Sequence, residues 1–165
     1  MPDRQPILPE DAIAIDIFIE AGEWPAEEAL QTLAERAVAA AADASASGRG
    51  HTLAILFADD QDIRVMNAHF RGKDKETNVL SFPPAPGVAE PGGPPHLGDI
   101  ALAYGTVARE AEAQGKTFDH HLTHLLVHGF LHLVGYDHET PEDAEKMESL
   151  ERLILEGLAI GDPYA

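Results

Sequence analysis

The sequence predicts an α+β fold with α/β-like alternation at its start: a single small domain in which helices cover a mixed sheet of roughly four strands. Two observations support this prediction. Short runs rich in isoleucine, leucine and valine, typical of strands, alternate with helical patterns in the first part of the chain. Helical patterns alone make up the last third. We expect one domain over residues 1–165, with a core from about 12 to 159, because this length suffices to bury one hydrophobic core.

Four segments have the composition of strands. Residues 12–19, "AIAIDIFI", are almost continuously apolar, which predicts a largely buried strand. Residues 52–57 and 78–82 predict two more strands, and "LGDIALA" at 97–103 predicts the fourth. Between the last two, residues 83–95 are rich in proline and glycine, which predicts a mobile loop.

Five segments carry apolar residues at helical spacing. Asp59 or Asp60 is a suitable N-cap for the second of them, and Gly72 is a suitable stop. We expect the C-terminal helices to carry the functional site described below. The predicted helices are Ala26–Asp43, the segment from Asp59 or Asp60 to Gly72, Thr106–Gln114, Asp119–Val134 and Glu142–Leu158.

Composition excludes several classes of protein. The 29 acidic and 11 basic residues give a net charge of -18, which should repel bulk nucleic acid, so we expect no DNA partner. The absence of cysteine excludes disulfides and thiolate metal sites, and is compatible with a reducing cytoplasm. The start of the chain lacks a secretory pattern, and no apolar stretch approaches the ~18 residues of a membrane span. We therefore expect a cytoplasmic protein with no membrane partner.

The stretch "HGFLHLVGYDH" predicts a metal site. Helical spacing places His128 and His132 on one face, four residues apart, where both imidazoles can reach one ion. Gly135 can then adopt a positive φ, so that the chain turns back and presents His138 to the same point. Three imidazoles with a fourth position open are typical of catalytic zinc. We predict one Zn²⁺ per chain, although nickel, copper and iron also accept this ligand set.

Other histidines leave alternatives open. His120 and His124 continue the four-residue spacing, so the stripe could be a solvated helix face, or His124 and His128 could be the ligand pair. Only the pair at 128 and 132 is followed by a glycine turn, so we interpret His124 as a core residue or one that supports the ligands. His120 and His121 are predicted to be exposed. We interpret the remaining histidines as structural, and they are His51, His69 and His96.

The residue after His128 bears on the type of reaction. In H-E-x-x-H peptidases a glutamate at this position takes a proton from the zinc-bound water. Here the position is Gly129, which disfavours peptide hydrolysis. Asp137 and Glu139 lie near the motif in sequence, but their direction relative to the ion is not predicted.

A basic cluster stands out in this acidic chain. The twelve residues from 64 to 75 contain four cations and a single acid, Asp74. The cations are Arg64, Arg71, Lys73 and Lys75. Phosphate binding is one use for such a cluster, and stabilising the end of a helix is the alternative. Arg71 is the best catalytic candidate, because a guanidinium binds two phosphate oxygens and keeps its charge.

These motifs resemble those of the bacterial YbeY-type endoribonucleases. "HGFLHLVGYDH" matches the family's histidine signature, "FRGKDKETNVLSFP" at 70–83 its second characteristic stretch, and "LGDIALA" the strand after the loop. The similarity extends over roughly residues 13–158, with the motifs in the same order. The 83–95 loop looks longer, and the surface more acidic, than is expected for the family.

The resemblance implies a metal-dependent, single-strand-directed endoribonuclease that acts in ribosomal RNA maturation, notably at the 3′ end of the small-subunit RNA, and in ribosome quality control. It implies zinc ligands at His128, His132 and His138 and a functional arginine at Arg71. The implied partners are ribosomal RNA and pre-ribosomal particles, and the acidic surface favours docking on a small-subunit ribosomal protein. Two alternatives stay open: a non-catalytic assembly factor stabilised by metal, and a metallopeptidase. Whether water or the RNA 2′-OH attacks is also open.

Overall fold

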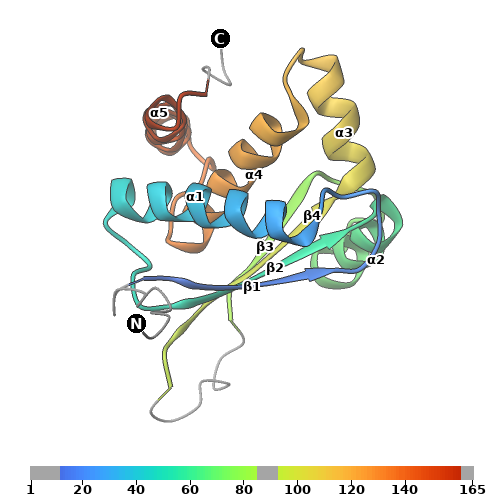
Figure 1. Ribbon diagram of the computed structural model, residues 1–165, viewed down its shortest axis with the longest axis horizontal. Helices are drawn as coiled ribbons and strands as arrows, with labels where there is room; N and C mark the ends of the chain where they lie inside the picture. Colours follow the sequence, from blue (N-terminus) through green and yellow to red (C-terminus); the bar gives the residue numbers. More distant parts are fainter. Residues whose placement is uncertain (1–11, 85–92, 161–165) are drawn as a thin grey trace, which may run out of the picture.

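The computed structural model describes residues 12–84 and 93–160. Within these ranges one four-stranded sheet has the order β1-β2-β4-β3 (Figure 1). β1 (Ala14–Ile19), β2 (Thr52–Ala58) and β4 (His96–Ala103) are parallel, whereas β3 (Val79–Phe82) pairs antiparallel with β4 at one edge. The predicted α+β fold with a mixed four-stranded sheet is therefore confirmed.

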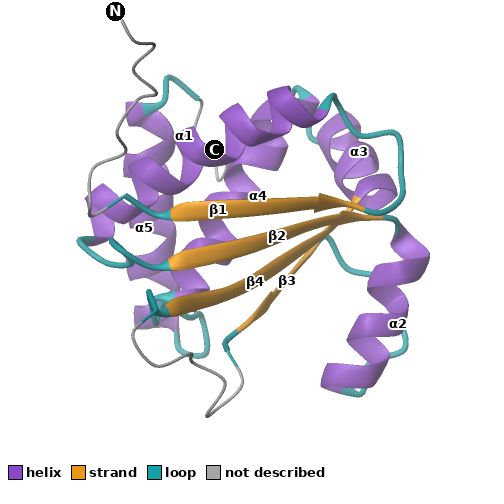
Figure 2. Ribbon diagram, turned by 60° about the horizontal axis from the view of Figure 1, so that its bottom comes forward, coloured by secondary structure: helices purple, strands orange, loops and turns teal. Residues whose placement is uncertain are grey.

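The described residues also form five helices, which pack around the sheet. Four of them, α1, α3, α4 and α5, lie over one face, and α2 lies on the other (Figures 1 and 2). Asp59 caps α2 as predicted, since its carboxylate accepts a hydrogen bond from the Asp62 backbone N–H at 2.8 Å. The helices are α1 (Glu27–Ser45), α2 (Asp60–Arg71), α3 (Tyr104–Ala113), α4 (Phe118–Leu133) and α5 (Pro141–Gly157).

The main core lies between the sheet and α1, α4 and α5. Alternate residues of β2, Leu53, Ile55 and Phe57, are fully buried on this face, as expected for a central strand. Helix α4 packs closely against the sheet at Gly129, where an added Cβ would lie 3.1 Å from Ser81 Oγ and 3.2 Å from Ile100 Cγ2. The helix that carries the histidine motif is thus held directly against β3 and β4.

The prediction that the first strand is largely buried is wrong. β1 forms the edge of the sheet opposite β3, and only Ile15 and Ile17 pack against the core. Phe18 and Ile19 are 52% and 42% exposed. An apolar run does not distinguish a central strand from an edge strand, because composition does not determine the order of strands in a sheet.

Several boundaries differ from the predicted ones by a few residues. Helix α3 begins at Tyr104 rather than 106, because β4 continues into it without a turn and Ala103 serves as its N-cap. Residues 85–92, the centre of the loop predicted to be mobile, lie outside the described residues. Among the helices described, none combines the length and apolar character that crossing a membrane requires.

Gly98 offers a test of the packing below α4. Its φ is +145°, and an added Cβ would lie 2.5 Å from the Phe82 carbonyl oxygen and 2.7 Å from Leu133 Cδ2. Gly98→Ala should lower the free energy of unfolding by about 2–5 kcal/mol, because a clash adds to backbone strain. Gly50→Ala is the control: φ is +78° there, with no heavy atom within 4 Å of the added Cβ. Its cost should be about 1 kcal/mol. If urea unfolding gave the same decrease in the free energy of unfolding for Gly98→Ala and Gly50→Ala, this packing would be contradicted.

Candidate metal centre

Helix α4 and the turn after it bring the three predicted histidines together. His128 and His132 lie on the last two turns of α4, with ring centroids 4.6 Å apart. Gly135 then adopts a φ of +109°, as predicted. Its N–H donates to the His132 carbonyl and the Tyr136 N–H to the Leu131 carbonyl, which is the Schellman pattern of helix ends. This turn reverses the chain and places His138 beside the helix.

The three side chains converge through the same ring nitrogen. His132 Nε2 lies 3.1 Å from His128 Nε2 and 3.2 Å from His138 Nε2, and the remaining pair is 3.4 Å apart. Nitrogens bound at about 2.0–2.1 Å to one tetrahedral ion would be separated by about 3.3–3.4 Å. The spacing of the three donors therefore fits a single transition-metal ion.

A buried carboxylate on α5 sets the orientation of His128. Glu151 is 0% exposed, and its Oε1 lies 2.6 Å from His128 Nδ1. This contact favours the tautomer in which Nδ1–H donates to the carboxylate and Nε2 offers a lone pair to its two neighbours. Lone pairs that face one another repel unless a cation lies between them, so this donor set suits a metal ion.

Sequence reasoning missed Glu151, although a signal was present. The apolar stripe of α5 includes Met147, Leu150 and Ile154. Glu151 lies four residues after Met147 and three before Ile154, which places a carboxylate on the buried face of the helix. Acids on such a stripe need a buried partner. His128 provides that partner.

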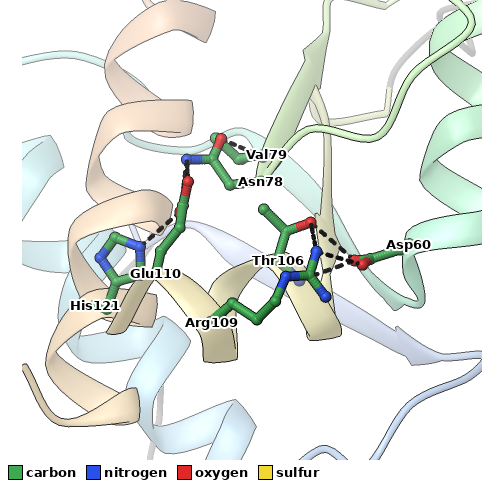
Figure 3. A network of polar contacts seen from close by, with 7 residues as sticks. All are labelled: Asp60, Asn78, Val79, Thr106, Arg109, Glu110 and His121. Carbon is green, nitrogen blue, oxygen red and sulfur yellow. Dashed lines mark hydrogen bonds and ion pairs between the residues drawn. The ribbon is translucent and has the colours of Figure 1, made fainter. Parts of the chain in front are cut away.

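Two further histidines of α4 have different surroundings. His124 Nε2 lies 3.7 Å from Glu151 Oε1, the same oxygen that contacts His128. His121 was predicted to be exposed, and this is wrong: it is 3% exposed. Its Nε2 lies 2.9 Å from Glu110 Oε1 on α3, and Glu110 also accepts from Asn78 (Figure 3). Burial lowers the pKa of His121, while the Glu110 carboxylate opposes the shift. The position near a helix start did not reveal that α3 covers this ring.

The predicted catalytic arginine lies at the end of α2, beside β3. Arg71 is exposed, and its Nη2 donates to the Ser81 carbonyl at 3.3 Å. The Ser81 hydroxyl in turn donates to the Gly129 carbonyl at 3.1 Å. Because Gly129 follows His128 on α4, a short chain of hydrogen bonds through one β3 residue connects the arginine to the histidine helix. The structure thus places Arg71 and the histidines along the same edge strand.

The other end of α2 is held by α3. Asp60 accepts hydrogen bonds from the Thr106 N–H and hydroxyl, both at 2.9 Å, and from Arg109 Nη2 at 2.8 Å (Figure 3). The same helix α3 contacts His121 of α4 through Glu110. One helix therefore joins α2 and α4, whose C-terminal ends carry Arg71 and the histidines.

Only some side chains of the basic cluster form ion pairs or hydrogen bonds with other described residues. Arg64 forms an ion pair with Asp74, with Nε and Oδ1 2.8 Å apart. Lys73 and Lys75 are exposed in the loop after α2. Asn67 holds this loop, because its Nδ2 donates to the Lys75 carbonyl at 2.9 Å. Lys73 and Lys75 are therefore exposed cations on an anchored loop.

Gly129, at the position where H-E-x-x-H peptidases have a glutamate, packs against the sheet. Because the Cβ direction of Gly129 meets Ser81 and Ile100, a glutamate there would collide with the sheet. Asp137 instead shapes the loop that carries His138, since its Oδ1 accepts from the Glu139 N–H at 3.2 Å. The arrangement offers three imidazoles and an arginine, without the base of H-E-x-x-H peptidases.

The His132 imidazole is held in its neutral form. Burial, assisted by the nearby His128 and His138 rings, lowers the pKa of His132 to about 4. The Glu151 carboxylate and a backbone hydrogen bond at Tyr136 act in the opposite direction. At neutral pH the ring therefore has a lone pair available for a cation.

This shift predicts a pH dependence for the metal-free protein. Unfolded His132 binds a proton near pH 6.5, whereas folded His132 does so only near 4. As pH falls through this window the unfolded state takes up more protons, so stability falls. Between about pH 7 and 4.5, the free energy of unfolding of wild type should fall by on the order of 1–2 kcal/mol more than that of His132→Gln. This figure allows for the partial exposure of the ring. His120→Gln, at an exposed position, should follow wild type. Parallel unfolding profiles for wild type and His132→Gln would contradict the shift.

Comparison with known proteins gives the family. The family model described as "Endoribonuclease YbeY" matches residues 17–159. The Endoribonuclease YbeY of Chelativorans sp. (strain BNC1) is 59% identical over 154 residues, which are 93% of this chain and 94% of that protein. The Endoribonuclease YbeY of Rhizobium meliloti (strain 1021) is 51% identical over 160 residues, which are 93% of this chain and 95% of that protein.

A solved structure agrees with the fold. The solution structure of TM1509 from Thermotoga maritima matches with a TM-score of 0.54 and 24% sequence identity, over 89% of this chain and 91% of that one. This likeness bears on the fold alone. The family model, by contrast, covers most of the chain, and the two relatives match over nearly their full length. The chain therefore belongs to the YbeY family of endoribonucleases.

Proposed function

We propose that this protein is a metal-dependent endoribonuclease that cleaves single-stranded RNA during maturation of ribosomal RNA, notably at the 3′ end of the small-subunit RNA, and in ribosome quality control. One observation carries the proposal: three converging imidazoles and an exposed arginine flank the same edge strand, β3. Such a pair of groups suits cleavage of a phosphodiester, which needs both a cation and a fixed donor for phosphate oxygens.

His128, His132 and His138 are the proposed ligands of one zinc ion. Their all-nitrogen donor set and their separations suit zinc, and three protein ligands leave one position for substrate. Bound by these residues, zinc would polarise a phosphate oxygen and lower the pKa of a bound water. Glu151 holds His128 in the required tautomer from behind. Nickel, copper or iron could occupy the same ligand set.

Arg71 is the proposed catalytic residue. A guanidinium has five N–H donors. In the exposed Arg71 side chain one Nη2–H binds the Ser81 carbonyl and orients the group, which leaves other N–H groups to bind a phosphate. Directed at a phosphate, these donors would stabilise the charge that develops on the non-bridging oxygens. The permanent charge of arginine makes this contribution independent of pH.

The proposed RNA substrate follows from the family, and the proposed docking partner follows from the surface charge. A chain with a net charge of -18 gains little from long-range attraction to RNA. We propose that it works on ribosomal RNA within pre-ribosomal particles in the cytoplasm, docked with the help of a small-subunit ribosomal protein. The exposed cations after α2 would then make only local phosphate contacts.

Zinc titration tests the ligand set and the role of Glu151. Chelator-treated wild type should bind one zinc ion per chain, and His132→Ala should lose this binding. Glu151→Gln keeps the size of the side chain but loses its charge, so zinc affinity should fall about 10- to 100-fold. Glu156→Gln, at an exposed position on the same helix, is the matched control and should bind like wild type. Calorimetry measures affinity and circular dichroism checks folding. Undiminished affinity in folded Glu151→Gln would refute the orienting role.

Substitution of Arg71 tests the catalytic assignment. Arg71→Ala should reduce cleavage of single-stranded RNA by about 100- to 1,000-fold, as for loss of one transition-state donor, and should retain zinc. Arg71→Lys should restore activity only in part, since the two-pronged geometry is absent. Arg36→Ala, an exposed arginine on α1, is the control. Full activity in Arg71→Ala would remove this residue from the mechanism. Mapping of product ends distinguishes the attacking group: a 2′,3′-cyclic phosphate indicates the 2′-OH, and a 3′-OH indicates water.

A further inference from the structure

The face of the sheet opposite α4 is only partly covered. Helix α2 packs over the ends of the strands, where Ile63, Ala58 and Ala103 form a small second core (Figure 2). Beside it lies a groove of about 1150 Å³ whose floor includes Ala54 and Ala101. This volume is slightly above the range of about 300–1,000 Å³ that is usual for ligand sites, so a nucleotide fits inside.

Aromatic rings form one wall of this groove. Phe70, the penultimate residue of α2, is 63% exposed, and its ring centroid lies 5.2 Å from that of Phe82 on β3. Met66 of α2 also lines the groove, as does Phe18 of β1, which is 52% exposed. Exposed aromatic faces of this kind are what single-stranded nucleic acids use for base stacking.

The groove also contains a polar group next to the aromatic wall. Asp99 on β4 is directly paired with Phe82 on β3, so both side chains project from the same face of the sheet. Asp99 Oδ1 lies 2.8 Å from His96 Nε2, and His96 Nδ1 lies 2.7 Å from Thr52 Oγ1. A carboxylate has lone pairs for more than one donor, so Asp99 can accept a second hydrogen bond while it keeps His96.

Charge at the rim suits a nucleic acid rather than an apolar peptide. Phe70 lines the groove, and the next residue, Arg71, binds the backbone of β3 at its edge. Lys73 and Lys75 follow in the exposed loop. In a chain with a net charge of -18, the Arg71 cation next to the Phe70 ring complements a phosphate that lies next to a stacked base.

We propose that this groove is a base-binding subsite for single-stranded RNA. A nucleobase of the bound strand stacks on Phe70, the exposed ring that Phe82 supports at a tilt of 57°, and Asp99 accepts a hydrogen bond from the exocyclic amino group of that base. Cytosine, which has such a group, is preferred over uracil, which presents a carbonyl oxygen at the same place. This inference rests on the proposed function and adds to it a means of substrate selection on the opposite side of β3 from the histidines.

Binding of two matched oligonucleotides tests the subsite. The zinc-loaded full chain is titrated with 2′-O-methyl oligo-C and oligo-U of equal length, and gels confirm that both stay intact. Wild type should bind oligo-C more tightly, by about 5- to 100-fold. Phe70→Ala should weaken the binding of both oligonucleotides by about 5- to 100-fold, which is the range for loss of one stacked base. Asp99→Asn should reduce the difference between them, because an amide can also donate to the uracil carbonyl oxygen.

The control is another exposed apolar residue of α2. Val65 is 62% exposed and does not line the groove, so Val65→Ala should bind both oligonucleotides like wild type. Wild-type affinity in Phe70→Ala would overturn the subsite and leave the groove as a surface for another class of partner. Equal binding of oligo-C and oligo-U by wild type would overturn the role of Asp99. Cleavage of unmodified single-stranded RNA is measured in parallel: no cleavage by wild type refutes the proposed function, whereas cleavage with unaltered Phe70→Ala binding refutes only the subsite.

Discussion

The close approach of α4 to β3 and β4 at Gly129 is the constraint on which the rest of the structure depends. With no side chain at this position, α4 lies directly on Ser81 and Ile100, and the Ser81 hydroxyl binds the helix backbone. This contact determines where His128 and His132 lie relative to the edge strand. The same strand residue holds Arg71 through its carbonyl. One point of packing therefore sets the relation between the imidazoles and the guanidinium, and it explains why the position cannot carry a peptidase glutamate.

Buried polar contacts then orient the side chains that this packing brings together. The Glu151 carboxylate, fully buried on α5, holds His128 with its Nε2 toward the other imidazoles. Helix α3 joins the two halves of the site, since Glu110 contacts His121 of α4 and Thr106 and Arg109 contact Asp60 of α2. A buried carboxylate is costly without such partners, so these contacts also restrict the core to one arrangement.

Much of this was predictable, and the exceptions have physical reasons. The spacing of His128, His132 and His138 around Gly135 predicts convergence because both the helical repeat and the glycine turn are local rules. Edge placement of β1, burial of His121 and the role of Glu151 depend on which elements meet across the fold. No local pattern encodes strand order or the partner of a buried acid. The acid on the apolar stripe of α5 was a signal that a partner exists, but it did not say which.

X-ray absorption at the zinc edge of the loaded full chain measures most directly whether three imidazoles bind one ion and leave a position open. We expect three imidazole nitrogens at about 2.0–2.1 Å together with a lighter oxygen ligand. In His138→Ala one imidazole should disappear from the spectrum. A wild-type spectrum with fewer than three imidazoles, or one unchanged by removal of His138, would contradict the account.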